Sequence, residues 1–411
     1  MTEHYDSLET RDPQERQQAL IQAVSAQVAH AKEKAPAYKT LFADVDPDAI
    51  TDAAAIAKLP VTRKSTLIEQ QQGNRPFGGY AAITAPELAH VFSSPGPIYE
   101  PGNNRPDYWR FARTLYAAGI RPGDLIQNCF SYHFTPAGSM VDSGAHALGC
   151  SVIPAGVGQS ELQVQTIVDL SPQAYTGTPS FLKIILDKAE ELGSDVRSIN
   201  KALVGGEALP PSLRAGFVEH GIRTQQCYAT ADLGIIAYES SAQEGLIIDE
   251  NVYLEIVRPG TGDPVAEGEV GEVAVTSLNP DYPLIRFATG DLSAIMPGTS
   301  PCGRTNRRIK GWMGRADQTA KVRGMFIHPE QVDKVVKRHP EIIKARLVIE
   351  WIEESDQIKL QCETNDADVS LDAAVVDSIR QICKLRGEVE LVEPDSLPND
   401  GKVIDDIRQY D

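Results

Sequence analysis

The sequence predicts an α/β protein with a large N-terminal domain on a mostly parallel sheet and a small C-terminal α+β domain. Between residues 107 and 228, strands alternate with helices every 20–25 residues, which is typical of right-handed βαβ units. From 250 to 300 the helical pattern disappears, and beyond it strands and helices no longer alternate in this way. We therefore place a domain boundary near 313 and expect domains of 1–313 and 314–411.

The composition is that of an acidic globular protein. The 411 residues are 42% hydrophobic and 23% charged, which excludes a disordered or fibrous chain. The 57 Asp and Glu outnumber the 39 Lys and Arg, for a formal charge of −18. This charge disfavours nucleic acids and anionic membranes as partners because both are polyanions. A local patch of N–H groups and cations can still bind a small anion.

Cysteine usage and hydropathy predict a cytoplasmic protein. The six cysteines form no CxxC pair, so we expect free thiols in a reducing compartment. No apolar run reaches the roughly 20 residues that span a bilayer, and the opening MTEHYDSLETRDPQER lacks an apolar signal core.

The first elements are a long helix and a series of short segments. A helix is expected over 12–34, with Asp12 as its cap, Pro13 in its first turn and Pro36 ending it. The stretch 93–106 is rich in Gly, Pro and Asn and is expected to be a loop.

Five helix–strand pairs follow. Helices are expected at 108–119, 138–148, 160–169, 179–191 and 210–219, and strands at 124–130, 151–154, 173–177, 199–205 and 223–228. Ligands of such sheets bind outside the carboxyl ends of the strands. The loops 176–179, 205–208 and 228–232 are therefore expected to line a site.

The last part of the chain has a different order of elements. Strands are expected first, and Gly311 to Gly314 resembles a joint. The expected strands are 252–257, 267–278, 343–351, 357–364 and 387–393, and the expected helices are 329–338 and 371–384.

Eight segments in this order resemble the adenylate-forming enzymes, and most of all the phenylacetate–CoA ligases. They are YDSLETRDP with AHAKEKAPAY, AAGIRPGD, ALGCSVIPAGVGQSELQVQTIVDLSPQ, TPSFL, VGGEALP, PLIRFATGDL, GRADQTAKVRGMFIHPEQVD and LPNDGKV. The resemblance implies that the small C-terminal domain is mobile. It also implies that a carboxylate reacts with ATP and Mg²⁺ to give an acyl-adenylate, and that coenzyme A then displaces AMP.

Three residues are implied to act on the nucleotide from the C-terminal half. Asp291 of PLIRFATGDL would accept hydrogen bonds from the ribose hydroxyls, with Arg315 as its companion. Lys402 of LPNDGKV would bridge the substrate carboxylate and the α-phosphate, where a cation stabilises the charge that develops in the transition state. Taken alone, the same residues are a Gly-Asp turn and a solvated lysine.

The turn VGGEALP is implied to hold adenine. Gly205 and Gly206 would let the base or an acyl chain lie against bare backbone, with Glu207 and Ala208 beside it. The alternative is a common strand-to-helix turn.

The acyl pocket is implied at SYHFTPAG (131–138) and the facing GVG. Aromatic side chains opposite glycines make a flat slot suited to an aryl acid. For His133 a structural role is the favoured interpretation. The implied pocket residues are Tyr132, His133, Phe134, Ala137, Gly156 and Gly158.

The segment GRADQTAKVRG is implied to be the hinge. Rotation at Asp317 would swing the small domain, and Arg323 and Gly324 would then approach coenzyme A. The alternative is an exposed polar turn.

The phosphate loop departs from the family pattern. Relatives have SSGTTGxP, whereas this chain has SSPGPIYEP (93–101). Ser93 and Ser94 remain to contact the phosphates. Proline lacks an N–H donor and Glu100 is an anion, so the loop is expected to hold the β- and γ-phosphates poorly.

The metal-binding motif also departs from the pattern. YATAD replaces YGxSE, so Asp232 takes the place of the Mg²⁺-binding Glu, and Tyr228, Ala229 and Thr230 are expected at the nucleotide. Cys302 resembles a zinc-bearing segment of some relatives. A zinc site needs about four ligands, so no zinc is expected.

The leading hypothesis is a ligase that joins an aryl or arylacetic acid to coenzyme A, with a homodimer as the candidate assembly. A second hypothesis, supported by the altered phosphate loop, is a binding or regulatory protein that has lost ATP chemistry. A third is adenylation with a carrier-protein thiol or an amine as acceptor.

Overall fold

The computed structural model describes residues 3–94, 98–316, 318, 320–322, 325–352, 355–365 and 369–408. The chain divides into two compact units. The first comprises Met1–Leu254, Val275–Ala288 and Ile295–Trp312; the second comprises Glu255–Ala274, Thr289–Ala294 and Met313–Asp411. The second unit thus includes two short segments that precede the predicted boundary near 313, and that boundary stays a prediction.

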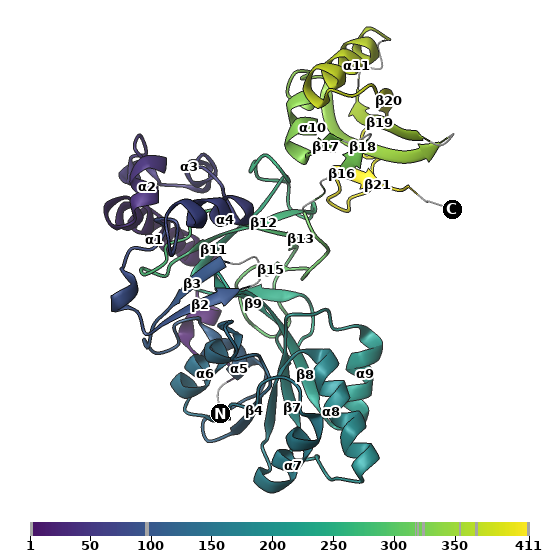
Figure 1. The fold of residues 1–411 in the computed structure, drawn as a ribbon. Coiled ribbons are helices and arrows are strands. Elements are labelled where there is room, and N and C mark those ends of the chain that lie inside the picture. Colours follow the sequence, from purple (N-terminus) through teal and green to yellow (C-terminus); the bar gives the residue numbers. More distant parts are fainter. Residues whose placement is uncertain are drawn as a thin grey trace. The chain divides into compact units, whose positions relative to one another are not determined.

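A nine-stranded sheet forms the centre of the first unit (Figure 1). Its order is β14-β15-β10-β9-β8-β7-β6-β4-β5. The parallel part consists of β4 (Leu125–Asn128), β5 (Ser151–Ile153), β6 (Ala174–Gly177), β7 (Lys201–Val204) and β8 (Arg223–Thr230). The antiparallel part is β9 (Gly234–Tyr238), β10 (Leu246–Ile248), β14 (Ile295–Met296) and β15 (Arg308–Ile309). The predicted α/β class and parallel sheet are confirmed, whereas these four antiparallel strands were not expected.

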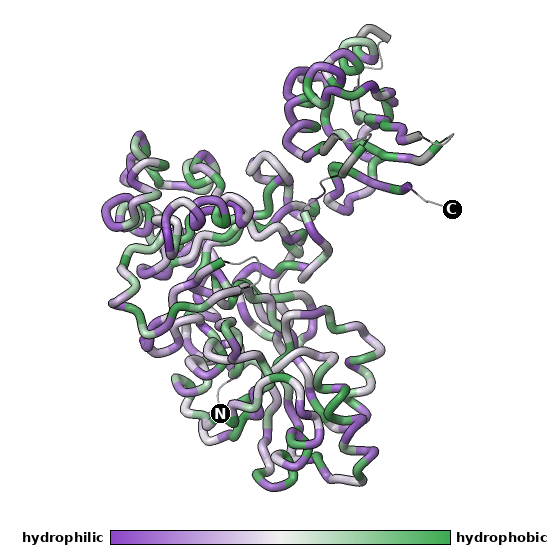
Figure 2. The backbone as a smooth tube through the Cα atoms, viewed as in Figure 1, coloured by the Kyte–Doolittle hydropathy of each residue, from purple (hydrophilic) through white to green (hydrophobic). Residues whose placement is uncertain are grey.

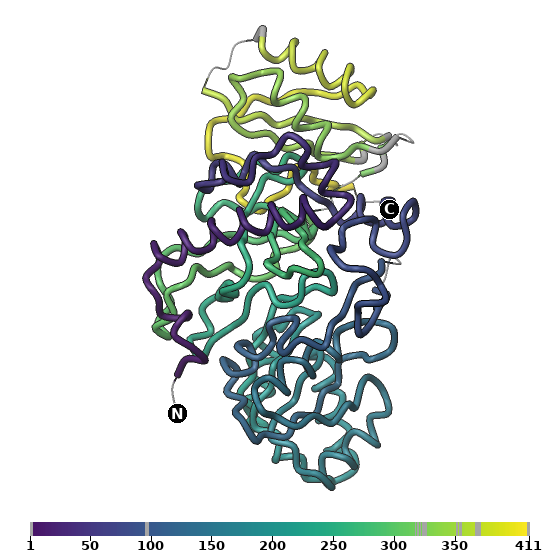
Figure 3. Tube along the Cα trace, turned by 90° about the vertical axis from the view of Figure 1, so that its left-hand side faces the viewer, coloured from purple at the N-terminus to yellow at the C-terminus, as the bar shows by residue number. Residues whose placement is uncertain are grey.

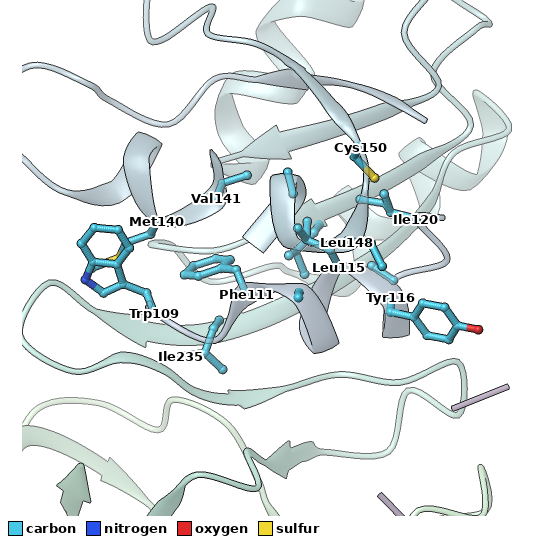
Figure 4. Close-up of a cluster of buried hydrophobic side chains, with 14 of the residues drawn as sticks. Trp109, Phe111, Leu115, Tyr116, Ile120, Met140, Val141, Leu148, Cys150 and Ile235 are labelled. Atoms are coloured by element: carbon cyan, nitrogen blue, oxygen red, sulfur yellow. The ribbon is translucent and has the colours of Figure 1, made fainter. Parts of the chain in front are cut away.

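Helices cover both faces of the parallel part. They are α5 (Phe111–Ala117), α6 (Ala137–Leu148), α7 (Ser160–Leu170), α8 (Pro179–Leu192) and α9 (Pro211–Glu219). Successive side chains of a strand point to opposite faces. Accordingly Ala174 packs with α5 and α6, in the cluster of Figure 4, while Tyr175 packs with α7, α8 and α9. Figure 2 shows hydrophobic and hydrophilic residues alternating along the helices that flank this sheet.

The N-terminal helix forms as predicted at both its start and its end. In α1 (Pro13–Lys34) the Asp12 carboxylate accepts from the N–H groups of Gln14 and Glu15. Pro36 ends α1 and also opens α2 (Pro36–Leu41), because proline suits the first helical position. Figure 3 shows α1 side-on. The short helices α3 (Ala53–Ala57) and α4 (Lys64–Gly73) follow.

The stretch 93–106, expected to be a loop, contains half of a β-hairpin. Strands β2 (His90–Ser94) and β3 (Ile98–Gly102) pair antiparallel, with Val91 opposite Pro101. The expectation was wrong because the prolines were taken as strand breakers. An isolated two-stranded hairpin consists of edge strands only, and edge strands tolerate proline. Residues 95–97 lie outside the described residues.

Two further sheets complete the fold. One has the order β1-β13-β12-β11, from β1 (Thr62–Arg63), β13 (Phe287–Ser293), β12 (Gly271–Ser277) and β11 (Val252–Val257). The other has the order β20-β19-β18-β21 and lies in the second unit. It comprises β18 (Ile342–Ile352), β19 (Ser355–Thr364), β20 (Glu388–Val392) and β21 (Ile404–Asp406).

Two helices pack on the four-stranded sheet of the second unit. Helices α10 (Pro329–Val336) and α11 (Val369–Cys383) share a hydrophobic core with it, and β16 (Ala320–Val322) pairs with β17 (Met325–Ile327). Among the described residues, every helix is too short or too polar to traverse a bilayer.

A buried carboxyl group supports the start of α5. Asp107 has φ +51°, in the left-handed region, and its Oδ1 accepts from the N–H of Ala112 at 2.9 Å. Burial, against the opposing effect of this hydrogen bond, raises the pKa of Asp107 to about 6. The folded chain therefore holds a proton here that the unfolded chain loses near its ordinary pKa of about 4.

Asp107→Asn is expected to flatten part of the pH dependence of stability. A carboxyl whose pKa is raised by folding stabilises the folded chain below its unfolded pKa, and this stabilisation is lost as the pH rises through the folded value. Asn keeps the accepting oxygen, tolerates positive φ and does not ionise. Urea unfolding from pH 4 to pH 7 is expected to show the variant gaining stability relative to the parent; parallel curves would contradict this.

Candidate active site

Polar side chains gather where the parallel strands end. Asn128 is the last residue of β4, and its Oδ1 accepts from the Thr176 hydroxyl of β6 at 3.0 Å. The N–H of Gly205, just after β7, donates to the carbonyl of Gly177 at 3.1 Å. The three loops expected to line a site follow β6, β7 and β8, so they lie at this same edge of the sheet.

Tyr132 is held at this edge by two residues that the sequence analysis did not single out. Its hydroxyl donates to Asp142 Oδ1 at 2.7 Å and accepts from Asn128 Nδ2 at 2.7 Å. The same Asn128 amide also donates to Asp142 at 3.1 Å. Burial, followed by the Asp142 carboxylate, raises the pKa of Tyr132 well above its ordinary value. A neutral phenol is therefore fixed in one orientation.

Glycines make room for the Tyr132 ring. A Cβ at Gly138 would lie 2.8 Å from the ring and a Cβ at Gly156 3.9 Å from it. The loop that carries Gly156 is fixed by the buried Gln163 amide, which donates to the Gly156 carbonyl at 3.0 Å. The backbone at Gly138 and Gly156 therefore accommodates the Tyr132 ring itself, and the aryl slot stays a prediction.

The other implied acyl-pocket residues lie further out. Phe134 has φ +63° and is 69% exposed, and its ring meets the exposed His133 edge-on at 4.6 Å. Gly158 is exposed and Ala137 half-buried. Of the six residues, only Tyr132 and Gly156 are seen to face each other, and the roles of all six stay predictions.

The turn after β7, for which adenine binding stays a prediction, contains two glycines that its local structure requires. Gly206 has φ +79°, and a Cβ at Gly205 would lie 2.9 Å from the Cys227 sulfur. Glu207 and Ala208 are exposed. Neither glycine can therefore be replaced without strain or displacement of a neighbour.

Strand β8 carries the next three implied residues. Tyr228, Ala229 and Thr230 are half-buried at its carboxyl end. The Thr230 hydroxyl accepts from the N–H of Leu233 at 3.2 Å. This bond shapes the turn that presents Asp232.

Two buried carboxylates lie at the phosphate loop. Glu100 is 1% exposed and Asp232 8% exposed. Ser94 Oγ donates to Glu100 Oε1 at 2.5 Å, and Lys64 Nζ donates to Asp232 Oδ2 at 2.8 Å. Burial, and next the charge of Asp232, raise the pKa of Glu100 to about 8 against the effects of Ser94 and Lys64. The sequence analysis identified Glu100 as a departure from the phosphate-loop pattern of the family, but it did not indicate Lys64.

The donor set at this place fits Mg²⁺. Glu100 Oε2 and Asp232 Oδ1 are buried and, among the described residues, have no hydrogen-bond partner. Mg²⁺ is bound in proteins through one or two carboxylates, with water or phosphate oxygens completing its shell. Since the described residues contain no group of three His, Cys, Asp or Glu that could hold a metal, the protein would supply only these two carboxylates to the ion.

The hairpin is joined to both the acyl loop and α4. The Ser93 N–H donates to the Phe134 carbonyl at 2.9 Å. The fully buried Gln71 amide donates to the Tyr99 carbonyl at 2.9 Å and accepts from the Tyr99 N–H at 2.8 Å. Ser93, Ser94 and Glu100 are therefore on a supported β-hairpin.

The second unit carries the implied ribose and lysine residues. Asp291 and Arg315 are bridged across neighbouring backbone segments, with Arg315 Nη1 2.8 Å from Asp291 Oδ1. Lys402 is exposed, and its Nζ lies 2.6 Å from Asp405 Oδ1. Gln318 holds the Lys402 turn by donating to the Gly401 carbonyl at 2.8 Å. Asp317, Arg323 and Gly324 lie outside the described residues.

Comparison with known proteins identifies the family. Residues 132–279 match the family model described as AMP-binding enzyme. The phenylacetate-coenzyme A ligase of Thermus thermophilus is 30% identical, over 86% of this chain and 83% of the relative. The chain belongs to the phenylacetate–CoA ligase family. The Escherichia coli (strain K12) member is 31% identical, over 80% of this chain and 78% of the relative.

A solved structure shares the fold of the present chain. The open conformation of 2-hydroxyisobutyryl-CoA ligase, in complex with 2-HIB-AMP and CoA, has a TM-score of 0.74 at 24% identity. The likeness covers 97% of this chain and 92% of that one. The predicted resemblance to the phenylacetate–CoA ligases and the predicted fold are thus confirmed.

Tyr132→Phe is expected to destabilise the first unit. It removes the donor to Asp142 and leaves that carboxylate and the Asn128 amide partly unsatisfied, at a cost of about 1–3 kcal/mol in the free energy of unfolding. The exposed Tyr5 is the matched control, for which Tyr5→Phe is expected to cost less than about 0.5 kcal/mol. Equal urea midpoints for the two variants would contradict the stabilising role of the hydrogen bonds among Tyr132, Asn128 and Asp142.

Proposed function

We propose that this chain catalyses the ATP-dependent ligation of a carboxylic acid to coenzyme A through an acyl-adenylate. Membership of the phenylacetate–CoA ligase family, at 30% identity over 86% of the chain, carries the proposal. The acid is proposed to be an aryl or arylacetic acid, because the relatives that carry the proposal are phenylacetate-coenzyme A ligases. Tyr132, His133, Phe134, Ala137, Gly156 and Gly158 are proposed to line its pocket.

Each unit carries residues that we propose for the nucleotide. Gly205, Gly206, Glu207 and Ala208, with Tyr228, Ala229 and Thr230, are proposed for adenine and its surroundings. Asp291 would accept from the ribose hydroxyls, for which a fixed carboxylate is suited because it offers only acceptors. Arg315, ion-paired with Asp291, would keep that carboxylate in place.

Adenylation requires that the negative charges of the phosphates and of the substrate carboxylate be neutralised. Asp232, with Ser93 and Ser94 nearby on the hairpin, would hold a Mg²⁺ that neutralises the phosphates of ATP. Lys402 would bring its ammonium to the developing charge on the α-phosphate. This lowers the barrier because the charge is greater in the transition state than in the ground state. Its present partner Asp405 lies in β21 and is also paired with Arg346, whereas the Lys402 side chain is exposed and would leave Asp405 for the phosphate.

The two-step reaction calls for a moving C-terminal domain. We propose domains of 1–313 and 314–411, joined at Asp317, with Arg323 and Gly324 in the channel for coenzyme A. All six cysteines are free thiols, which is typical of a reducing compartment, and we propose a cytoplasmic location. A homodimer stays a prediction.

Release of AMP tests the activity directly. The purified protein with ATP, Mg²⁺ and a panel of aryl and arylacetic acids is expected to release AMP in step with thioester formation when coenzyme A is present. AMP release that requires a carrier protein or an amine, and ignores coenzyme A, would point to another acceptor. No AMP release with any acid would contradict adenylation.

Lys402→Ala is expected to lose adenylation and keep thioester formation from a supplied acyl-adenylate. The ammonium acts only while the C–O–P bond forms, so its removal is expected to slow that half-reaction by at least about 100-fold. Lys334→Ala, which removes an exposed lysine of α10, is the matched control and is expected to leave both half-reactions unchanged. A Lys402 variant that adenylates normally would contradict the assigned role.

One observation favours a second candidate. Glu100 is a buried acid in the hairpin proposed to hold the phosphates, and its carboxyl group repels ATP once it ionises, above a pKa of about 8. A protein that binds acyl-CoA without ATP chemistry would have this property. Calorimetry separates the candidates, since binding of acyl-CoA with no binding of ATP–Mg²⁺ would favour the second.

A further inference from the structure

We propose that Glu100 and Asp232 together hold a divalent cation before any nucleotide binds, which makes the acid of the altered phosphate loop a metal ligand. The inference deepens the proposed function, and the purpose of the cation rests on that function. The test of cation binding is independent of the proposed function, because it uses no substrate.

Each carboxylate has one occupied and one open oxygen. Ser94 occupies Glu100 Oε1 and Lys64 occupies Asp232 Oδ2. The other two oxygens are buried and, among the residues that the structure describes, have no hydrogen-bond partner. A buried carboxylate oxygen without a partner is costly, so two of them in one place point to a bound cation.

Helix α4 fixes the two carboxylates relative to each other. Lys64 begins the helix and is paired with Asp232. Gln71, two turns later, clamps the backbone of Tyr99, the residue before Glu100. The same helix therefore holds both sides of the site, and the carboxylates are preorganised rather than assembled by the nucleotide.

A divalent cation would make this place positive. When Glu100 is protonated, Asp232 and Lys64 balance each other. A divalent cation that takes the place of the Glu100 proton changes the net charge of the group from 0 to +1. The hairpin would then attract a triphosphate, which compensates for the N–H donors that its prolines lack.

Mn²⁺ alone is the probe, because it is a close substitute for Mg²⁺ at oxygen sites and is seen by electron paramagnetic resonance. Titration of the full chain, with no ATP, acid or coenzyme A, is expected to show one site. Glu100→Gln and Asp232→Asn are each expected to raise its dissociation constant at least about tenfold. Glu219→Gln removes the same charge from an exposed position and is expected to bind as the parent does.

Thermal unfolding with and without Mn²⁺ keeps the test independent of folding defects. The parent and Glu219→Gln are expected to gain stability with Mn²⁺, and Glu100→Gln to remain folded and gain less. Absence of Mn²⁺ binding by the parent would overturn the proposal. That result is expected if the two carboxyl groups share a proton in place of a metal ion. Unchanged binding by Glu100→Gln would also overturn it. A chain that binds Mn²⁺ but never releases AMP would overturn the proposed function alone.

Discussion

Repulsion between negative charges governs what this site can do. An acid–CoA ligase must bring a carboxylate against a triphosphate, and this chain already buries Glu100 and Asp232 at the place where phosphates are expected. Lys64 neutralises Asp232, and burial keeps Glu100 protonated below a pKa of about 8, so neither pair leaves positive charge for the phosphates. Additional positive charge has to come from a bound cation and from Lys402, so both proposals concern the same electrostatic requirement.

The scaffold orients the groups of the candidate site with neutral amide side chains. Gln71 clamps the hairpin, Gln163 the loop of Gly156, and Asn128 the Tyr132 hydroxyl. Each amide both donates and accepts, so it satisfies backbone or side-chain groups without adding charge. The hairpin β2–β3 is further joined to the loop 131–138, which is proposed for the acyl group, by the Ser93–Phe134 hydrogen bond.

The sequence predicted those parts of the fold that depend on local periodicity. The parallel strands and their helices alternate regularly, and α1 has its Asp12 cap. The hairpin β2–β3 was missed because Pro95, Pro97 and Pro101 conceal its alternation, and β9 because it follows β8 after a tight turn. Such pairings depend on distant or edge contacts, which no local pattern records.

The candidate site shows the same division. Tyr132, Gly156 and Asp232 belong to quoted motifs, so a family resemblance could indicate them. Asn128, Asp142 and Lys64 belong to none, and act through contacts 4 to 168 residues apart in sequence. Gln163 lies in a quoted motif, but nothing in that motif marks it as the partner of Gly156. A single sequence offers no signal for such partners, and they become visible only when the strands are placed side by side.

Exchange of labelled pyrophosphate into ATP tests the central claim most directly, because it reports the reversible formation of an acyl-adenylate without the second half-reaction. We expect exchange that requires an aryl or arylacetic acid and Mg²⁺, and that proceeds in the absence of coenzyme A. If no acid supports exchange while the folded protein still binds acyl-CoA, the chain has kept the fold of a ligase without its chemistry.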